Sequence, residues 1–204
     1  MNDTGLSSQL IQAAQTMSAW ECVAVALGIA YLLLAVRESL WCWYAAFVST
    51  GIFLVLFWEV SLLMESALQV YYLAMAVYGW WQWQQHGDNQ GALAISRWRP
   101  RQHLVAVAAV LLLSAISGFL LQRYTAAALP FLDSFTTWGS ILTTWMVTRK
   151  ILENWLYWLV IDAVSIYLYL DRELYLTAFL FVVYLVIVLF GYRKWSLHYQ
   201  ATSG

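Results

Sequence analysis

Residues 151–170, ILENWLYWLVIDAVSIYLYL, decide the fold of this chain. The stretch is apolar along most of its length, with Glu153 near its start and a second acid, Asp162, at its middle. An α-helix rises 1.5 Å per residue, so about 20 residues cover the roughly 30 Å hydrocarbon core of a bilayer. The stretch therefore predicts a transmembrane helix with an acid near the bilayer midplane.

The composition extends this prediction to the whole chain. Of its 204 residues, 63% are hydrophobic and only 10% are charged, with a mean hydropathy of +0.67. Soluble domains carry about 25% charged residues. The net charge of −1 lacks the basic excess of a nucleic-acid-binding protein. The apolar runs are continuous, whereas a transmembrane barrel would alternate apolar and polar residues, so the sequence predicts an all-α membrane protein.

Seven apolar runs are long enough to be membrane spans: 19–36, 40–57, 66–83, 104–122, 134–147, 151–170 and 174–190. Lys and Arg favour the cytoplasmic side of short loops, which gives an independent test of this number. With the N-terminus outside, eight of the ten basic residues fall on the inner side, namely Arg37, Arg97, Arg99, Arg101, Arg149, Lys150, Arg193 and Lys194. Only Arg123 and Arg172 fall outside. We therefore predict seven spans with an external N-terminus and a cytoplasmic C-terminus.

Two groups of residues indicate an internal repeat, which is common in transporters. Glu38 and Trp43 have the same spacing as Glu153 and Trp158, and Tyr72, Gly79 and Trp83 have that of Tyr184, Gly191 and Trp195. This pattern pairs the first three spans with the last three, in parallel orientation. The predicted organisation is a tail at 1–18, a three-helix bundle at 19–83, a cytoplasmic loop at 84–103, a linker helix at 104–122, a second bundle at 133–195 and a tail at 196–204.

Asp162 is the main functional candidate among the charged residues. An ionised acid at the bilayer centre costs about 2.5 to 3.5 kcal/mol, so it should face a cavity, a partner or a substrate. The alternative is a protonated or hydrogen-bonded acid, with Ser165 one turn further on as its partner. The acids at span ends, Glu153 among them, are expected to be solvated.

Polar and aromatic side chains form stripes on three of the spans. One stripe contains Trp155, Trp158, Asp162, Ser165 and Tyr169, with Asn154 beside it, and a second contains Asp133, Thr137, Ser140 and Thr144. The second stripe fits two interpretations equally well: pore lining, or interhelical hydrogen bonding with close packing through small hydroxyl residues. The candidate substrate-binding residues are Gln69, Tyr72, Trp138, Ser140, Thr144, Asn154, Trp155, Trp158 and Asp162.

An acid, amides and an aromatic wall suit a flat cationic ring, held by stacking and cation–π attraction, although sugars also stack on Trp. An intramembrane serine or metal-dependent enzyme is excluded, because neither GxSxG nor HExxH occurs and no histidine lies inside a span. Cysteine and histidine spacing predicts no metal site, and no cofactor is expected. The sequence therefore predicts a transporter.

Two stretches carry a resemblance to a known family. Residues 68–83, LQVYYLAMAVYGWWQW, and 133–158, DSFTTWGSILTTWMVTRKILENWLYW, resemble the bacterial nicotinamide riboside transporter (PnuC) family. The resemblance covers spans two to seven, about three-quarters of the chain. It assigns substrate contact to Gln69 and Asn154, and also to Trp158 and Asp162, whereas Trp138 is a candidate from its depth in the span.

The resemblance implies a 3+1+3 parallel-repeat fold, similar in layout to SWEET sugar transporters, in the bacterial inner membrane. It also implies alternating-access import of nicotinamide riboside, with phosphorylation by a cytoplasmic kinase trapping the cargo, and it allows a homo-oligomer. Thiamine is an alternative cargo because it too bears a ring cation, whereas riboflavin is neutral and would leave Asp162 without a counter-ion. A proton-coupled transporter of another small solute is a further alternative.

Overall fold

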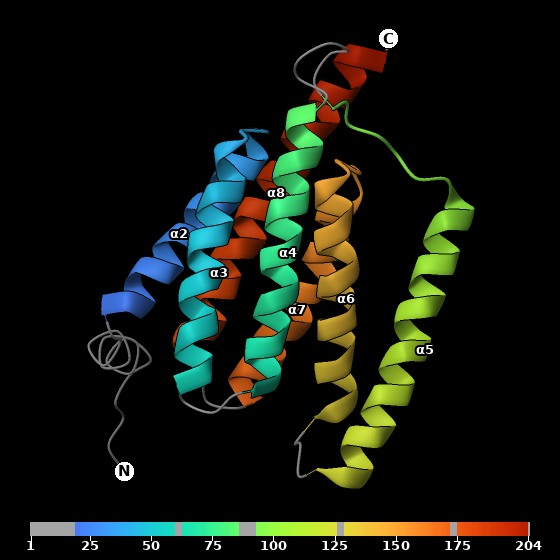
Figure 1. Ribbon diagram of the computed structural model, residues 1–204. Coiled ribbons are helices and arrows are strands. Elements are labelled where there is room, and N and C mark those ends of the chain that lie inside the picture. The colour runs from blue at the N-terminus through green and yellow to red at the C-terminus, as the bar shows by residue number, and fades with distance from the viewer. Residues whose placement is uncertain (1–18, 60–62, 86–92, 126–128, 172–174, 204) are drawn as a thin grey trace, which may run out of the picture. The chain divides into compact units, whose positions relative to one another are not determined.

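The computed structural model describes residues 19–59, 63–85, 93–125, 129–171 and 175–203, and these form seven helices (Figure 1). The helices are α2 (Ala19–Val36), α3 (Trp41–Glu59), α4 (Leu63–Gln85), α5 (Pro100–Tyr124), α6 (Pro130–Thr148), α7 (Asn154–Asp171) and α8 (Tyr175–Ser203). The predicted all-α fold with seven helices is confirmed. The predicted tail at 1–18 and Arg172 lie outside the described residues.

Several helices extend beyond the apolar runs that predicted them. Helix α5 begins with Pro100 in its first turn, a position where proline's missing N–H costs nothing. Helix α6 likewise begins at Pro130 and has 19 residues, longer than the run at 134–147. Helix α8 continues to Ser203, so the predicted tail at 196–204 is largely helical. A span predicted from hydropathy ends at the first charged residues. The helix itself continues past them, because its backbone hydrogen bonds also form in water.

The helices group into two compact units. In the first unit, α3 packs against α2 and α4, and the last residues of α8, from Arg193 onward, belong to the same unit. In the second unit, which begins at Ile95, α6 packs against α5 and α7. The predicted linker helix therefore contacts α6 directly. The bundle boundaries predicted from the repeat stay a prediction.

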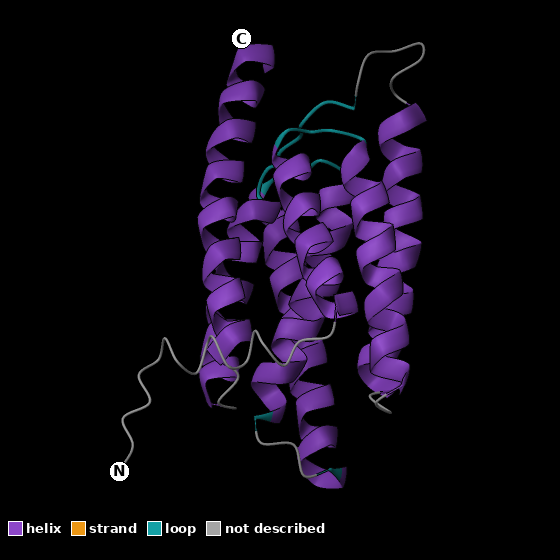
Figure 2. Cartoon of the chain, turned by 90° about the vertical axis from the view of Figure 1, so that its left-hand side faces the viewer, coloured by secondary structure: helices purple, strands orange, loops and turns teal. Residues whose placement is uncertain are grey.

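Within the described ranges, extended pairing is limited to one isolated bridge, between Ser96 and Ile151, and Figure 2 shows helices joined by loops. The Ser96 N–H donates to the Lys150 carbonyl at 3.0 Å, and the Leu152 N–H donates to the Ser96 carbonyl at 2.8 Å. The bridge therefore fastens the segment before α5 to the turn between α6 and α7.

The structure gives the internal repeat a single register of 112 residues. The ends of the paired helices follow it: Val36 and Thr148, Glu59 and Asp171, and Leu63 and Tyr175 are each 112 residues apart. The pairing of Tyr72, Gly79 and Trp83 with Tyr184, Gly191 and Trp195 has the same register. Helices α2, α3 and α4 thus correspond to α6, α7 and α8.

The turns after α2 and α6 are the most closely repeated backbone features. Glu38 and Lys150 have left-handed φ values of 56° and 49°. The residue after each donates back across its turn, Ser39 to the Leu34 carbonyl at 3.0 Å and Ile151 to the Met146 carbonyl at 3.1 Å. This is the Schellman helix ending, usually made with glycine, and here it uses a charged residue twice.

The same register corrects one predicted pairing. Glu38 corresponds to Lys150, not to Glu153, and Trp43 corresponds to Trp155, not to Trp158. Each of these two tryptophans lies against a glycine of the third helix of its repeat. A Cβ on Gly79 would lie 2.3 Å from the Trp43 ring, and one on Gly191 would lie 2.6 Å from the Trp155 ring. Both repeats therefore use the glycine to admit an indole.

By length and composition alone, three apolar stretches of the described helices could cross a membrane: Ala19–Val36, Pro100–Tyr124 and Thr177–Thr202. Helix α3 contributes a shorter apolar stretch, Trp41–Leu56. The remaining helices are less apolar because they carry amides, hydroxyls and acids. On α6 and α7 many of these polar side chains are buried within the protein.

Candidate transport site

Helix α7 separates a polar face from an apolar one. Four polar or aromatic side chains on it are buried: Asn154, Trp155, Asp162 and Ser165. Four large side chains are exposed on it: Leu156, Val160, Tyr167 and Leu170. A soluble helix would show the reverse pattern. The arrangement is that of a helix with a lipid-facing side and a protein-facing side.

Asp162 lies on the buried face, halfway along the helix. It is the ninth of the 18 residues of α7, and only 3% of its surface is exposed. No hydrogen bond or ion pair joins it to any residue of the described part of the chain, including Ser165, the partner considered from the sequence. Tyr184 of α8 lies within electrostatic reach of its carboxylate. The acid is thus buried without a cation of its own protein among the described residues.

Asn154 occupies the first position of α7 and is fully buried. Its Nδ2 donates to the Ile151 carbonyl at 2.7 Å, which holds the amide against the turn between α6 and α7. Its Oδ1 is buried and accepts no hydrogen bond within the described residues. A buried amide oxygen without a donor is available to accept a hydrogen bond from a ligand.

Glu153 corrects the prediction that the acids at span ends are solvated. It is 6% exposed, and its carboxylate accepts from Arg97 Nε at 2.9 Å and from the Trp98 N–H at 3.2 Å. With the bridge at Ser96, these bonds hold the segment before α5 against the turn that carries Asn154. No sequence pattern predicts this contact, because Arg97 and Glu153 are 56 residues apart.

Replacing Glu153 with Ala is expected to destabilise the protein by about 1 to 3 kcal/mol, because two donors lose a buried acceptor. Arg97 is itself 53% exposed, so the charge attraction contributes the smaller part of this loss. Thermal unfolding in detergent measures the effect. Glu59→Ala, which removes an exposed acid at the end of α3, is the matched control and should leave the unfolding temperature unchanged. Equal unfolding temperatures of the two variants would contradict the stabilising role of the buried Glu153 carboxylate.

The hydroxyls of the α6 stripe are used mainly within their own helix. Thr136 and Thr137 each donate to the Asp133 carbonyl at 2.9 Å, and Thr143 donates to the Gly139 carbonyl at 2.8 Å. A Cβ on Gly139 would lie 3.0 Å from Ile161 of α7, so this face packs closely against α7. Close packing through small residues, one of the two interpretations kept open, describes this part of the stripe.

The remaining candidates of the second unit are distributed over two faces of α6 and one of α7. Thr144 is buried and Ser140 half-buried on α6, and Trp158 is half-buried on α7. Trp138 turns its indole toward α5, where its Nε1 donates to Ser117 Oγ at 3.1 Å. Its depth in the span therefore reflects packing between α5 and α6, a contact that the sequence did not predict.

Gln69 and Tyr72 belong to the first unit, on α4, and both are half-buried. The Tyr72 ring lies 5.6 Å from that of Tyr71. The structure therefore brings Asn154, Trp155 and Asp162 onto one buried face of the second unit, with Trp158 beside them. Within the described residues there is no group of three or more His, Cys, Asp or Glu side chains that could hold a metal ion.

Apolar helices long enough to span a membrane, a three-helix repeat that occurs twice, and a buried acid at the middle of a helix define the class, which is that of multi-pass membrane transporters. The chain belongs to the nicotinamide mononucleotide transporter family, whose model matches residues 18–197. This match covers all seven described helices except the last turns of α8.

Two relatives and one solved structure show what the chain is similar to. It is 29% identical over 182 residues to the riboflavin/roseoflavin transporter RibM of Streptomyces davaonensis, covering 87% of this chain and 84% of RibM. It is 26% identical over 201 residues to the nicotinamide riboside transporter PnuC of Escherichia coli, covering 86% and 84%. A crystal structure of the vitamin B3 transporter PnuC has the same fold, with a TM-score of 0.74, 21% identity, and coverage of 96% of this chain and 88% of that one.

Proposed function

We propose that the chain is a facilitator that carries nicotinamide riboside across the bacterial inner membrane, with its N-terminus periplasmic and its C-terminus cytoplasmic. The observation that carries this proposal is the buried carboxylate of Asp162, which meets no cation among the described residues. Nicotinamide riboside has a positively charged pyridinium ring. Pairing this ring with the acid would offset the cost of burying each charge separately.

Neighbouring residues would recognise the rest of such a cargo. The half-buried Trp158 offers an aromatic face to the ring, an attraction of about 0.5 to 2 kcal/mol. The buried Oδ1 of Asn154 would accept from the carboxamide or from a ribose hydroxyl. Gln69, Tyr72, Ser140, Thr144 and Trp155 are proposed as further contacts from their places on polar faces, and Trp138 is kept only as a support for α6.

The relatives bear names of two different vitamins at similar identity, so the proposed cargo depends on the site. Riboflavin is neutral and would leave Asp162 unpaired. Thiamine carries a ring cation and is therefore the second candidate cargo, favoured by the same acid. In either case we propose alternating access without covalent chemistry, with a cytoplasmic kinase trapping the cargo after entry.

Uptake into proteoliposomes tests the proposed transport mode. Labelled nicotinamide riboside is expected to equilibrate across the membrane without ATP, and an uncoupler should leave the initial rate unchanged. Accumulation above the external concentration that collapses with the uncoupler would contradict the facilitator and favour a proton-coupled role for Asp162. Empty liposomes provide the background rate.

A further inference from the structure

A groove of about 430 Å³ runs along the first part of α5 in the second unit. It is lined by Trp98, Arg101, Gln102, Val105, Ala106, Ala109 and Trp145. Two of these residues are alanines on one face of α5, so the helix presents a shallow surface between the larger side chains. The groove has a polar end at Arg101 and Gln102, and the rest of its lining is apolar or aromatic. None of its lining residues belongs to α7, which carries Asp162.

The aromatic wall of the groove is held in place by the structure behind it. The rings of Trp98 and Trp145 lie 6.1 Å apart, and the Trp98 N–H donates to the buried carboxylate of Glu153. The ring of Trp98 also lies 5.4 Å from that of His103, whose Nδ1 is 2.9 Å from the Tyr157 hydroxyl. The wall is thus formed before any ligand arrives.

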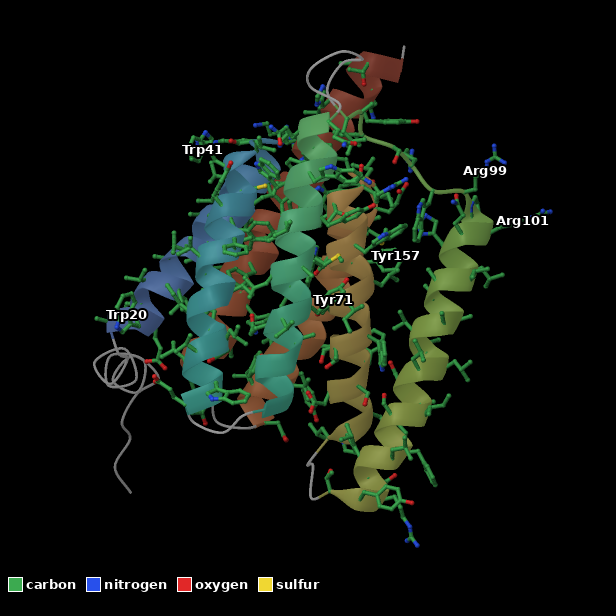
Figure 3. All side chains as sticks on the ribbon, in the orientation of Figure 1. Trp20, Trp41, Tyr71, Arg99, Arg101 and Tyr157 are labelled. Carbon is green, nitrogen blue, oxygen red and sulfur yellow. The ribbon has the colours of Figure 1, made fainter. Side chains whose placement is uncertain are left out.

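Positive charge gathers at the start of α5, where Arg101 lines the groove and Arg99 lies just before the helix. Arg99 and Arg101 are exposed and extend outward at the start of α5 (Figure 3). Glu153, the acid nearest to this segment in the described contacts, is already bound to Arg97. No carboxylate of the described residues forms an ion pair with Arg99 or Arg101. An anion at this end would therefore meet uncompensated charge.

The dimensions of the groove match the depth profile of a bilayer. Arg101 lies in the first turn of a 25-residue apolar helix, so it lies near the membrane interface. From Arg101 to Ala109 the helix rises about 12 Å, which leads from the headgroup region into the acyl-chain region. The charged end thus faces headgroups and the alanine end faces acyl chains.

We propose that this groove binds an anionic phospholipid of the surrounding bilayer. The lipid phosphate would pair with Arg99 and Arg101, and one acyl chain would lie over Ala106 and Ala109 between α5 and the indole of Trp145. Basic pockets between membrane helices recognise anionic headgroups in this way. This lipid site is independent of the identity of the cargo.

Native mass spectrometry of the full chain tests the site, with dioleoylphosphatidylglycerol and dioleoylphosphatidylcholine as probes at equal concentration. The wild type is expected to retain the anionic lipid in preference to the zwitterionic one. Arg99→Gln with Arg101→Gln should weaken retention of the anionic lipid about fivefold for each charge removed, with little change for the zwitterionic lipid. Ala109→Phe fills the groove and should weaken retention of both.

Arg123→Gln is the matched control, because it removes an exposed basic residue at the other end of the same helix. Gel filtration confirms that each variant remains folded and monodisperse. Equal retention of the two lipids by the wild type would overturn the proposal, as would an equal loss in the Arg123 variant. A chain-to-chain complex that Ala109→Phe abolishes, with no lipid preference, would overturn it in favour of a second copy of this chain.

Discussion

Replacing Asp162 with Asn is expected to weaken binding of nicotinamide riboside about thirtyfold, while the protein stays folded. The substitution keeps the size of the side chain and removes its charge. Truncating a buried, paired charge costs about 2 kcal/mol or more, which corresponds to this factor. Because Asp162 is 3% exposed, water would screen the lost attraction only weakly.

A matched ligand separates charge from shape in this experiment. Reduced nicotinamide riboside has nearly the same outline but a neutral ring, so its affinity should change less than about threefold between the wild type and the Asn variant. Asp171→Asn, at the exposed end of the same helix, should change neither affinity. If both ligands lost affinity equally in the Asp162 variant, the acid would serve structure and not charge recognition.

Placing a methyl group on Gly79 or Gly191 is expected to destabilise the protein by about 1 to 3 kcal/mol, the usual cost of overpacking a core. The new Cβ would lie 2.3 Å from the ring of Trp43 in one variant and 2.6 Å from that of Trp155 in the other. Both indoles are buried and have little room to move. Thermal unfolding in detergent measures the loss.

Gly51 provides the matched control, because a Cβ there would meet nothing within 4 Å. Gly51→Ala is expected to stabilise its helix by up to about 1 kcal/mol through the higher helix propensity of alanine. Gly191→Ala should also weaken nicotinamide riboside binding, since it displaces Trp155 next to Asn154. Unchanged melting of both the Gly79 and the Gly191 variants would contradict the repeated contact between glycine and indole.

The sequence predicted the features that hydropathy and burial cost determine. Seven apolar runs predicted seven helices, and Asp162, the acid at the middle of 151–170, is a buried residue halfway along α7. The repeat was found from Tyr72, Gly79 and Trp83, because glycine and aromatic residues at fixed spacing record a packing contact. These inferences needed only local periodicity.

Contacts between distant segments could not be predicted in the same way. The equivalence of Trp43 with Trp155 was missed because Trp155 and Trp158 offered two neighbouring choices, and only the glycine that each indole contacts decides between them. Glu153 looked like a solvated acid until Arg97 and the Trp98 N–H were placed beside it. Trp138 looked like a wall of the site, but its partner Ser117 is on another helix.

Calorimetric titration of the purified protein with nicotinamide riboside, thiamine and riboflavin at one pH shows whether the site at Asp162 selects a cationic cargo. We expect nicotinamide riboside to bind most tightly, and riboflavin, which brings no charge to Asp162, to bind at least about tenfold more weakly. Tightest binding of thiamine would keep the cationic site and change the cargo. Tightest binding of riboflavin would contradict the proposed pairing of the buried acid with a cationic ring.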